Sequence, residues 1–281
     1  MAETDATIGD TYPPPHHVLR ALGYSVVHRP DLTSTARLPV GPHLLGGSGE
    51  VATGALATLV DATGGGLAAL AARPDWIATS GLTLHLYGPV RAEHVAAQAR
   101  VVRRGRTTVV LAVDLLADAD RPVGTATMTF ALLPRRDANP VMPVLDRPVH
   151  HGFAPFDDTP PPDLDTAIGV EVGPDSARAP VHPFVINTLG AMQGGVVATL
   201  IARAATEAAT RRLGDPTVCV DLAIDYLALG KHGPVRAEAH PVRTEPEWVQ
   251  SEVAVHDEGA DGRRTAVARA VAVRTGREPR R

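Results

Sequence analysis

The sequence is short of several features, and each shortage excludes a class of structure. Cys219 is the only cysteine among 281 residues, so no intrachain disulfide can form and no cysteine cluster can hold a metal. No uninterrupted apolar run approaches the roughly 18 residues of a membrane span. Residues 1–20 also lack the apolar segment of a signal peptide. We therefore expect a cytoplasmic protein with no membrane partner.

Charge and composition are those of an ordinary globular protein. Hydrophobic residues make up 44% and charged residues 21% of the chain, so a packed core is available. The net charge is -4 and the basic residues are scattered, which argues against a nucleic-acid partner. The pairs His16-His17 and His150-His151 have no third ligand at metal-binding spacing, so we expect no metal.

The two halves of the chain repeat each other. A shift of 141 places residues 34–61 over residues 175–202 without a gap, so that Gly49 matches Gly190 and Gly54 matches Gly195. Such a long-period repeat indicates two copies of one structural unit.

Beyond the first helix of each half the shift becomes 140, which pairs Val95 with Val235. The hexapeptide GPVRAE occurs at 88–93 and again at 233–238, but aligning these copies requires a shift of 145. We treat that identity as a coincidence, because it would need an insertion and a deletion around one hexapeptide.

Each repeat predicts a first strand, a Gly-rich loop, one long helix and three or four further strands. The expected first strands are about 34–40 and 174–181, the helices are 54–75 and 194–214, and the later strands of the first half are 82–88, 94–102, 107–116 and 124–133. Both helices are apolar on nearly all sides, so each should be wrapped by its sheet. The expected units are residues 1–134, a Pro-rich extended linker over 135–163, and residues 164–281.

The stretch NTLGAMQGGVVATLIA, residues 187–202, places an Asn, a spaced Gly and a Gly-Gly pair directly before the second helix. Free N–H groups at a helix start, with the positive end of the helix dipole behind them, suit a developing oxyanion. Glycines let a substrate carbonyl approach the backbone closely. No acid or nucleophile follows on this helix, so this half supplies only part of a site.

The missing acid lies on the first helix. Asp61 is the only charge between Glu50 and Arg73, at the position that Ala202 takes in the second helix. Burial of a carboxylate among aliphatic residues raises its pKa and its basicity towards water. The alternative, a solvated helix residue, fits this apolar segment less well.

A long buried helix embraced by an antiparallel sheet and preceded by N-x-x-G-x-x-Q-G-G resembles the hotdog fold. More narrowly, the sequence resembles the phenylacetate-pathway (PaaI-like) branch of acyl-CoA thioesterases. The residues that carry the resemblance include Asn187, Gly190 and Gln193-Gly194-Gly195, together with ATLVDA and TSGLTLHLYGPV in the first half. The resemblance implies an α+β double hotdog, with two tandem repeats that each wrap a long helix in an antiparallel sheet. We expect the two sheets to join into one surface with both helices on one side.

The resemblance also implies that paired units share each active site. Asn187, Gln193, Gly194 and Gly195 of the second repeat should meet Asp61 of the first in one complete catalytic site. Thr79 matches a position where this family often places a hydroxyl that orients the acid or water.

The reciprocal site should be inactive. It would be built from Gly46, Ala52, Thr53 and Ala202, and it lacks both the Asn and the acid. Cys219 takes the position of Thr79 there.

Several of these residues also have structural interpretations. Asn187 can cap its loop, the Gly-Gly pair can permit close helix packing, and Thr79 can be a plain strand residue. Gln193 replaces the family's commoner His, and an amide hydrogen-bonds but cannot titrate.

Two further motifs are less clearly functional. Arg103, Arg104 and Arg106 fit a charged hairpin turn, with contact to CoA phosphates as the lesser alternative. Gly64-Gly65-Gly66 lies mid-helix, where each glycine costs roughly 1 kcal/mol against Ala, so a packing reason should exist.

We expect hydrolysis of an acyl-CoA thioester to free acid and CoA, within fatty acid metabolism. No cofactor is needed, because CoA enters as part of the substrate. Two alternatives stay open, an acyl-thioester dehydratase or hydratase and a non-enzymatic acyl-CoA binder. The former needs a catalytic His, and neither loop before a helix has one after His43 or His182. The role of Asp61 as base or nucleophile, the acyl chain and a homo-oligomer are also left open.

Overall fold

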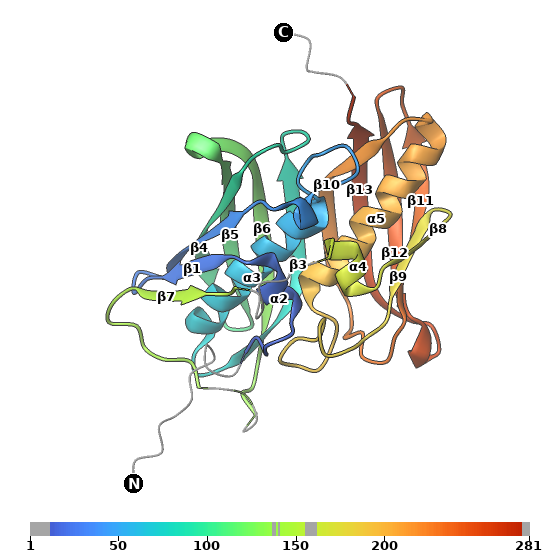
Figure 1. Ribbon diagram of the computed structural model, residues 1–281. Coiled ribbons are helices and arrows are strands. Elements are labelled where there is room, and N and C mark those ends of the chain that lie inside the picture. Colours follow the sequence, from blue (N-terminus) through green and yellow to red (C-terminus); the bar gives the residue numbers. More distant parts are fainter. Residues whose placement is uncertain (1–11, 137–138, 140, 155–161, 277–281) are drawn as a thin grey trace.

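The computed structural model describes residues 12–136, 139, 141–154 and 162–276. Its thirteen strands form one antiparallel sheet, which curves around two long helices that lie on the same side of it (Figure 1). The strand order is β7-β1-β2-β4-β5-β6-β3-β10-β13-β12-β11-β9-β8. The joined sheet and the placement of both helices confirm the expected α+β double hotdog.

The helices are α2 (Val18–Leu22), α3 (Thr53–Ala72), α4 (Leu164–Ile168) and α5 (Gly194–Leu213), with short 3-10 turns η1 (Pro42–Leu44), η2 (Asp118–Asp120) and η3 (Glu258–Ala260). The strands of the first half are β1 (Ser25–His28), β2 (Thr33–Pro39), β3 (Trp76–Leu86), β4 (His94–Arg104), β5 (Thr108–Ala117), β6 (Arg121–Leu133) and β7 (Val149–Gly152). Those of the second half are β8 (Glu171–Gly173), β9 (Ser176–Ala179), β10 (Thr217–Tyr226), β11 (Val235–Thr244), β12 (Trp248–Asp257) and β13 (Arg263–Arg274).

The two long helices form because their residues can be buried on nearly every side. By length and composition α3 could cross a membrane, but 83% of its most apolar window is buried inside this fold. It is therefore the core helix of the first repeat, wrapped by the sheet as its all-round apolar pattern predicts.

Two equivalent glycines let α3 and α5 cross closely. A Cβ on Gly54 would lie 2.6 Å from side-chain atoms of Thr199, and a Cβ on Gly195 would lie 2.5 Å from Cα of Thr58. Only glycine fits at either position without a shift of the neighbouring helix. This crossing brings Asp61, two turns into α3, to the beginning of α5.

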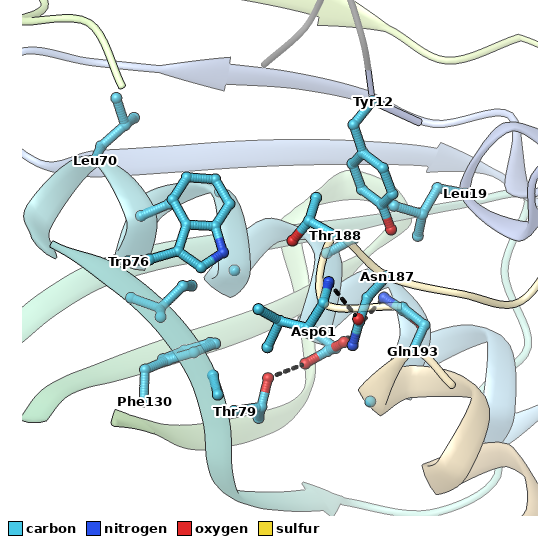
Figure 2. Close-up of a pocket in the computed structure, with 18 of the residues that line it drawn as sticks. Tyr12, Leu19, Asp61, Leu70, Trp76, Thr79, Phe130, Asn187, Thr188 and Gln193 are labelled. Atoms are coloured by element: carbon cyan, nitrogen blue, oxygen red, sulfur yellow. Dashed lines mark hydrogen bonds between the residues drawn. The ribbon is translucent and has the colours of Figure 1, made fainter. Parts of the chain in front are cut away.

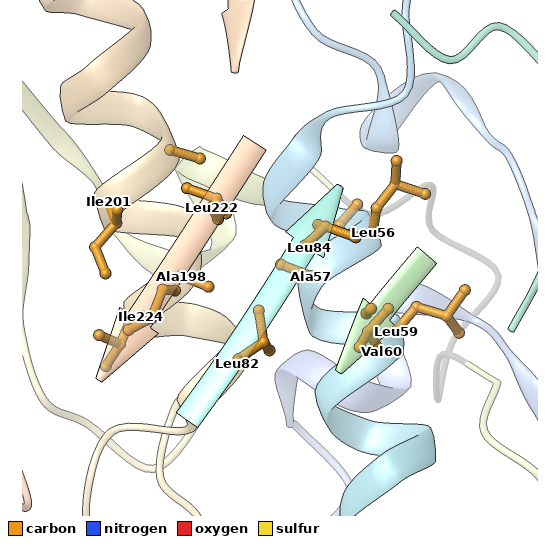
Figure 3. Packing of buried hydrophobic residues seen from close by; sticks show 14 of the residues in the cluster. Leu56, Ala57, Leu59, Val60, Leu82, Leu84, Ala198, Ile201, Leu222 and Ile224 are labelled. Carbon is orange, nitrogen blue, oxygen red and sulfur yellow. The ribbon is translucent and has the colours of Figure 1, made fainter. Parts of the chain in front are cut away.

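The two repeats share one core. β3 and β10 pair in the middle of the sheet, with Leu82 opposite Ile224 and Leu84 opposite Leu222. These four buried side chains belong to a cluster that contacts both helices (Figure 3). The halves are therefore parts of one packed body.

The strand register confirms the alignment of the repeats. Leu38 lies opposite Val95 in the first half, and Ala179 lies opposite Val235 in the second. The first strands are thus related by 141 and their partners by 140, as expected from the sequence. The first GPVRAE copy, at 88–93, precedes β4, whereas Val235 begins β11, so the two copies are not equivalent.

The linker contributes more than the sequence indicated. Residues 149–152 form β7, which pairs with β1 and places Val26 opposite His151. The sequence predicted only an extended linker here, because VHHG has no apolar alternation. The expected unit boundaries at 134 and 164 stay predictions.

Candidate active site

A cavity of about 650 Å³ lies where α3, the β1–β7 ribbon and the loop before α5 meet. This volume is within the range of small-molecule sites, about 300–1,000 Å³. Its walls include Asp61 and Thr79 of the first repeat and Asn187, Gln193 and Gly194 of the second. The structure therefore brings these five predicted residues together around one cavity.

Asp61 is held from both repeats. Its side chain projects from α3 into the cavity wall, and the residue is only 6% exposed. Thr79 Oγ1 donates to Oδ1 at 3.2 Å, and Gln193 Nε2 donates to Oδ2 at 2.9 Å (Figure 2). The Gly195 N–H also donates to Oδ2, at 3.0 Å. The acid of the first repeat is thus bound to the helix start of the second.

Burial dominates the electrostatics of this carboxyl. Desolvation raises the pKa of Asp61 from 3.8 to about 6, against the lowering effect of the hydrogen bonds from Gly195 and Thr79. Asp61 is therefore ionised at neutral pH but keeps substantial basicity. These are the requirements of a general base.

Three tyrosines surround this charge, and no pattern in the sequence indicated them. Burial, and then the charge of Asp61, raise the pKa values of Tyr12, Tyr24 and Tyr226 above their ordinary range. All three stay protonated, and Tyr226 Oη donates to the Gly194 carbonyl at 2.8 Å. They come from segments far apart in the chain, so only the tertiary structure could reveal them.

The N–H groups of the two glycines that begin α5 differ in their hydrogen bonding. The Gly195 N–H is occupied by Asp61, whereas the Gly194 N–H has no hydrogen-bond partner within the described part of the chain. Gly194 also lines the cavity, and a Cβ there would lie 3.0 Å from both Asp61 carboxylate oxygens. Gly194 therefore has an unpaired N–H that can donate to a ligand in the cavity.

The Asn187 side chain caps its own loop and also lines the cavity. Its Oδ1 accepts from the N–H groups of Leu189 at 2.8 Å and Ala191 at 3.3 Å, which is the expected loop cap. Its Nδ2 has no partner among the residues that the structure describes. That amide can donate to a ligand in the cavity.

Thr79 is aimed at the site by an irregularity in its strand. The pairing of β3 with β6 shifts register between Thr79 and Gly81. A bulge of this kind re-aims the neighbouring side chains. The hydroxyl consequently reaches Asp61 across the cavity wall.

The pseudo-equivalent position has the same backbone but different side chains. The Gly46 N–H donates to the Glu50 carbonyl at 2.7 Å, as the Asn187 N–H does to Ala191 at 2.8 Å. Thr53 Oγ1, however, donates to the Cys219 carbonyl at 2.5 Å. Ala202 stands on α5 where Asp61 stands on α3, and Ala52 stands where Gln193 is in the other repeat. The helix position of the acid is therefore empty of a carboxylate, although buried Glu50 lies beside Gly46 in this loop.

The arginine motif lies away from the cavity. Arg104 donates to the carbonyls of Ala71 at 2.8 Å and Ala72 at 3.3 Å, and so caps the end of α3. Neither Arg103 nor Arg106 lines the cavity either. The suggested contact of these arginines with CoA phosphates stays a prediction.

Two of the three helix glycines have packing reasons. A Cβ on Gly64 would lie 2.4 Å from Met128 Sδ, and one on Gly66 would lie 2.8 Å from His28 Cε1. A Cβ on Gly65 would meet nothing within 4 Å. Over the described residues, no group of three or more His, Cys, Asp or Glu side chains could hold a metal.

Comparison with known families agrees with this architecture. Residues 49–123 and 189–263, more than half of the chain, each match the thioesterase superfamily. The chain belongs to this superfamily. The two matched segments of this thioesterase-superfamily protein are offset by 140 residues, in agreement with the repeat shifts of 141 and 140. Among curated proteins none matches the sequence.

Solved structures show the same fold at low identity. An acyl-ACP thioesterase from Bacteroides thetaiotaomicron is 13% identical, with a TM-score of 0.57 over 86% of this chain and 98% of that one. A conserved hot dog fold protein of unknown function from Alicyclobacillus acidocaldarius is also 13% identical, with a TM-score of 0.53 over 87% and 94%. These likenesses establish the fold alone; thioester hydrolysis follows from the superfamily.

Proposed function

We propose that this protein hydrolyses acyl-CoA thioesters to free acid and CoA at the single site that contains Asp61. The observation that carries the proposal is the meeting of two complementary parts from different repeats. A buried carboxylate from α3 lies against the beginning of α5, beside the unpaired N–H of Gly194. A base and an oxyanion donor are the two groups that this hydrolysis requires.

The reaction is assigned to these groups as follows. The thioester carbonyl oxygen accepts from the Gly194 N–H and Asn187 Nδ2, and the positive end of the α5 dipole stabilises the oxyanion as it develops. Asp61 takes a proton from water while the water oxygen forms a bond to the carbonyl carbon. Collapse of the tetrahedral intermediate breaks the C–S bond, and the thiolate of CoA takes from Asp61 the proton that came from water. No cofactor is required.

The hydrogen bonds leave one oxygen of Asp61 able to act as a base. Oδ2 already accepts from Gln193 and Gly195, whereas Oδ1 accepts only from Thr79. Each carboxylate oxygen has about two lone-pair sites, so Oδ1 keeps one for a water proton. Thr79 lies beside that lone pair, where its hydroxyl can orient the water.

A hydratase or dehydratase finds less support. The groups that donate to Asp61 are Thr79, Gln193 and Gly195, and none of them is a titratable partner. His28 and His151 line the cavity, but burial lowers the pKa of His28 to about 4 and its Nδ1 is bonded to Ser34 Oγ at 2.6 Å.

A thiol-release assay tests the proposal. Wild type should release CoA from members of an acyl-CoA panel, and the same acyl groups on acyl carrier protein test which carrier is preferred. Asp61→Asn should abolish release, whereas Asp114→Asn on the exposed face of β5 should leave it unchanged. Absence of thiol release from every acyl-CoA with the folded protein would reject the proposed function.

A further inference from the structure

The cavity continues from Asp61 along one face of α3. The helix residues that line it are Asp61, Ala62, Gly65, Gly66, Ala69 and Leu70. These positions recur at helical spacing and extend about 13 Å along the axis, at 1.5 Å per residue. The cavity therefore has room beyond the thioester for a substantial acyl group.

This opening belongs to the repeat that has the acid. At Gly65 a Cβ would point into open space, whereas its equivalent on α5, 141 residues later, is Thr206. Gly66 corresponds in the same way to Glu207. The second repeat thus carries a side chain where Gly65 leaves open space, whereas the space beside Gly66 is taken by His28. The opening at Gly65 therefore coincides with the complete site.

A line of rings forms another part of the cavity wall. Tyr24 and Phe153 have ring centroids 4.9 Å apart, His151 and Phe153 are stacked at 6.2 Å, and His28 lies 5.9 Å from His151. All four residues line the cavity. Tyr24 and His28 lie just before β1 and at its end, whereas His151 and Phe153 lie in β7 and just after it. The linker is therefore part of the acyl chamber.

Two polar atoms of this wall lack partners. Tyr24 is 4% exposed and His28 is 8% exposed. His28 Nδ1 is bonded to Ser34, but His28 Nε2 and Tyr24 Oη have no hydrogen-bond partner within the described residues. Both side chains face the cavity, so a ligand there can supply the missing bonds.

The chemistry of the acyl group follows from the cost of leaving these atoms unpaired. A plain alkyl chain would displace water from Tyr24 Oη and His28 Nε2 and give nothing in return, at a cost of about 1–3 kcal/mol for each buried group. Phenylalanine would line an alkyl chamber at no such cost. We propose that the chamber takes an acyl group with an oxygen substituent, a hydroxyl or oxo group, which Tyr24 and His28 bind.

This proposal rests on the proposed function, but its test can be separated from it. Butanoyl-, hexanoyl-, octanoyl- and decanoyl-CoA, each with and without a terminal hydroxyl, are assayed for hydrolysis. Their binding to Asp61→Asn is measured by calorimetry. We expect one hydroxylated member to exceed its plain counterpart in kcat/KM and in affinity by about tenfold, the worth of roughly one good hydrogen bond.

Substitutions test the two walls. Tyr24→Phe should remove most of that tenfold preference, whereas Tyr87→Phe, at an exposed tyrosine 66% accessible, should keep it. Gly65→Val should exclude the longer members and spare the shortest, with the fold checked by circular dichroism. Hydrolysis without any preference for the hydroxyl, or a preference equal in Tyr24→Phe and wild type, would overturn the inference alone. No hydrolysis but preserved preferential binding would reject the proposed function alone.

Discussion

Asp61→Asn should make the protein more stable at neutral pH while it removes hydrolysis. The folded-state pKa of about 6 lies above the ordinary 3.8, so the folded protein binds this proton more tightly than the unfolded chain does. The associated stability is present in full below pH 3.8 and is lost as the pH rises through 6. Relative to a neutral side chain at this position, ionisable Asp61 therefore lowers the free energy of unfolding by about 3 kcal/mol at pH 8 and about 1.5 kcal/mol at pH 5.

The amide fits the hydrogen bonds of the site. The Asn oxygen can accept from Gln193 Nε2 and the Gly195 N–H, as Oδ2 does now, and the Asn NH₂ can donate to Thr79 Oγ1. The second amide N–H and the Thr79 hydroxyl both lie at the cavity, where water can accept from them, so the substitution removes the buried charge at a small new cost. Turnover loses its base and should fall by about 10² to 10⁴.

Urea unfolding of both proteins between pH 5 and 8 measures the first effect, and thiol release measures the second. The variant should be the more stable by on the order of 3 kcal/mol at pH 8, with a gap that narrows as the pH falls. A variant no more stable than wild type at pH 8 would contradict the inference that the buried charge of Asp61 destabilises the fold. Retention of more than about a tenth of wild-type turnover would contradict the role as base.

Four other outcomes are expected. The kcat/KM of wild type should rise with pH around a midpoint near 6, because protonated Asp61 cannot accept a proton, and a flat profile over this range would exclude it as the base. Asn187→Ala or Gly194→Val should lower turnover by about 10²–10³, whereas Gly46→Ala should act only on stability, as thiol release beside urea unfolding can establish. Active-site titration should count one competent site per chain, and a count of two would show that the pairing of the halves is wrong. Gly65→Ala should raise the free energy of unfolding by about 0.4–1 kcal/mol, because its Cβ meets no atom, and a loss of stability would contradict that open space.

The architecture and the acid could be predicted because each depends on a pattern within the chain. The ungapped repeat fixed the number of units, and the strand register then followed the shifts of 141 and 140. Asp61 stood out as a lone charge in an apolar helix. Its environment could be anticipated for the same reason, since a helix buried on all sides also buries its one carboxyl.

Other features depend on contacts that no linear pattern contains. Only the tertiary fold brings Tyr12, Tyr24 and Tyr226 together around Asp61. The different hydrogen bonding of the Gly194 and Gly195 N–H groups depends on where the Asp61 oxygens lie. β7 could not be predicted, because a four-residue edge strand with two histidines carries little periodic signal. Likewise, the use of Arg104 as a helix cap depends on where its strand meets the end of α3.

The two repeats belong to one chain and meet where β3 pairs with β10, and this changes how substitutions are inherited. In an assembly of identical units, any residue placed on the helix appears in every site, so the helix start and the acid position must serve all roles at once. In this chain a glycine at position 65 opens one chamber while Thr206 keeps the other helix filled. Each half can therefore accumulate changes that its twin could not tolerate, and the second helix is free to specialise as the partner that never carries the acid.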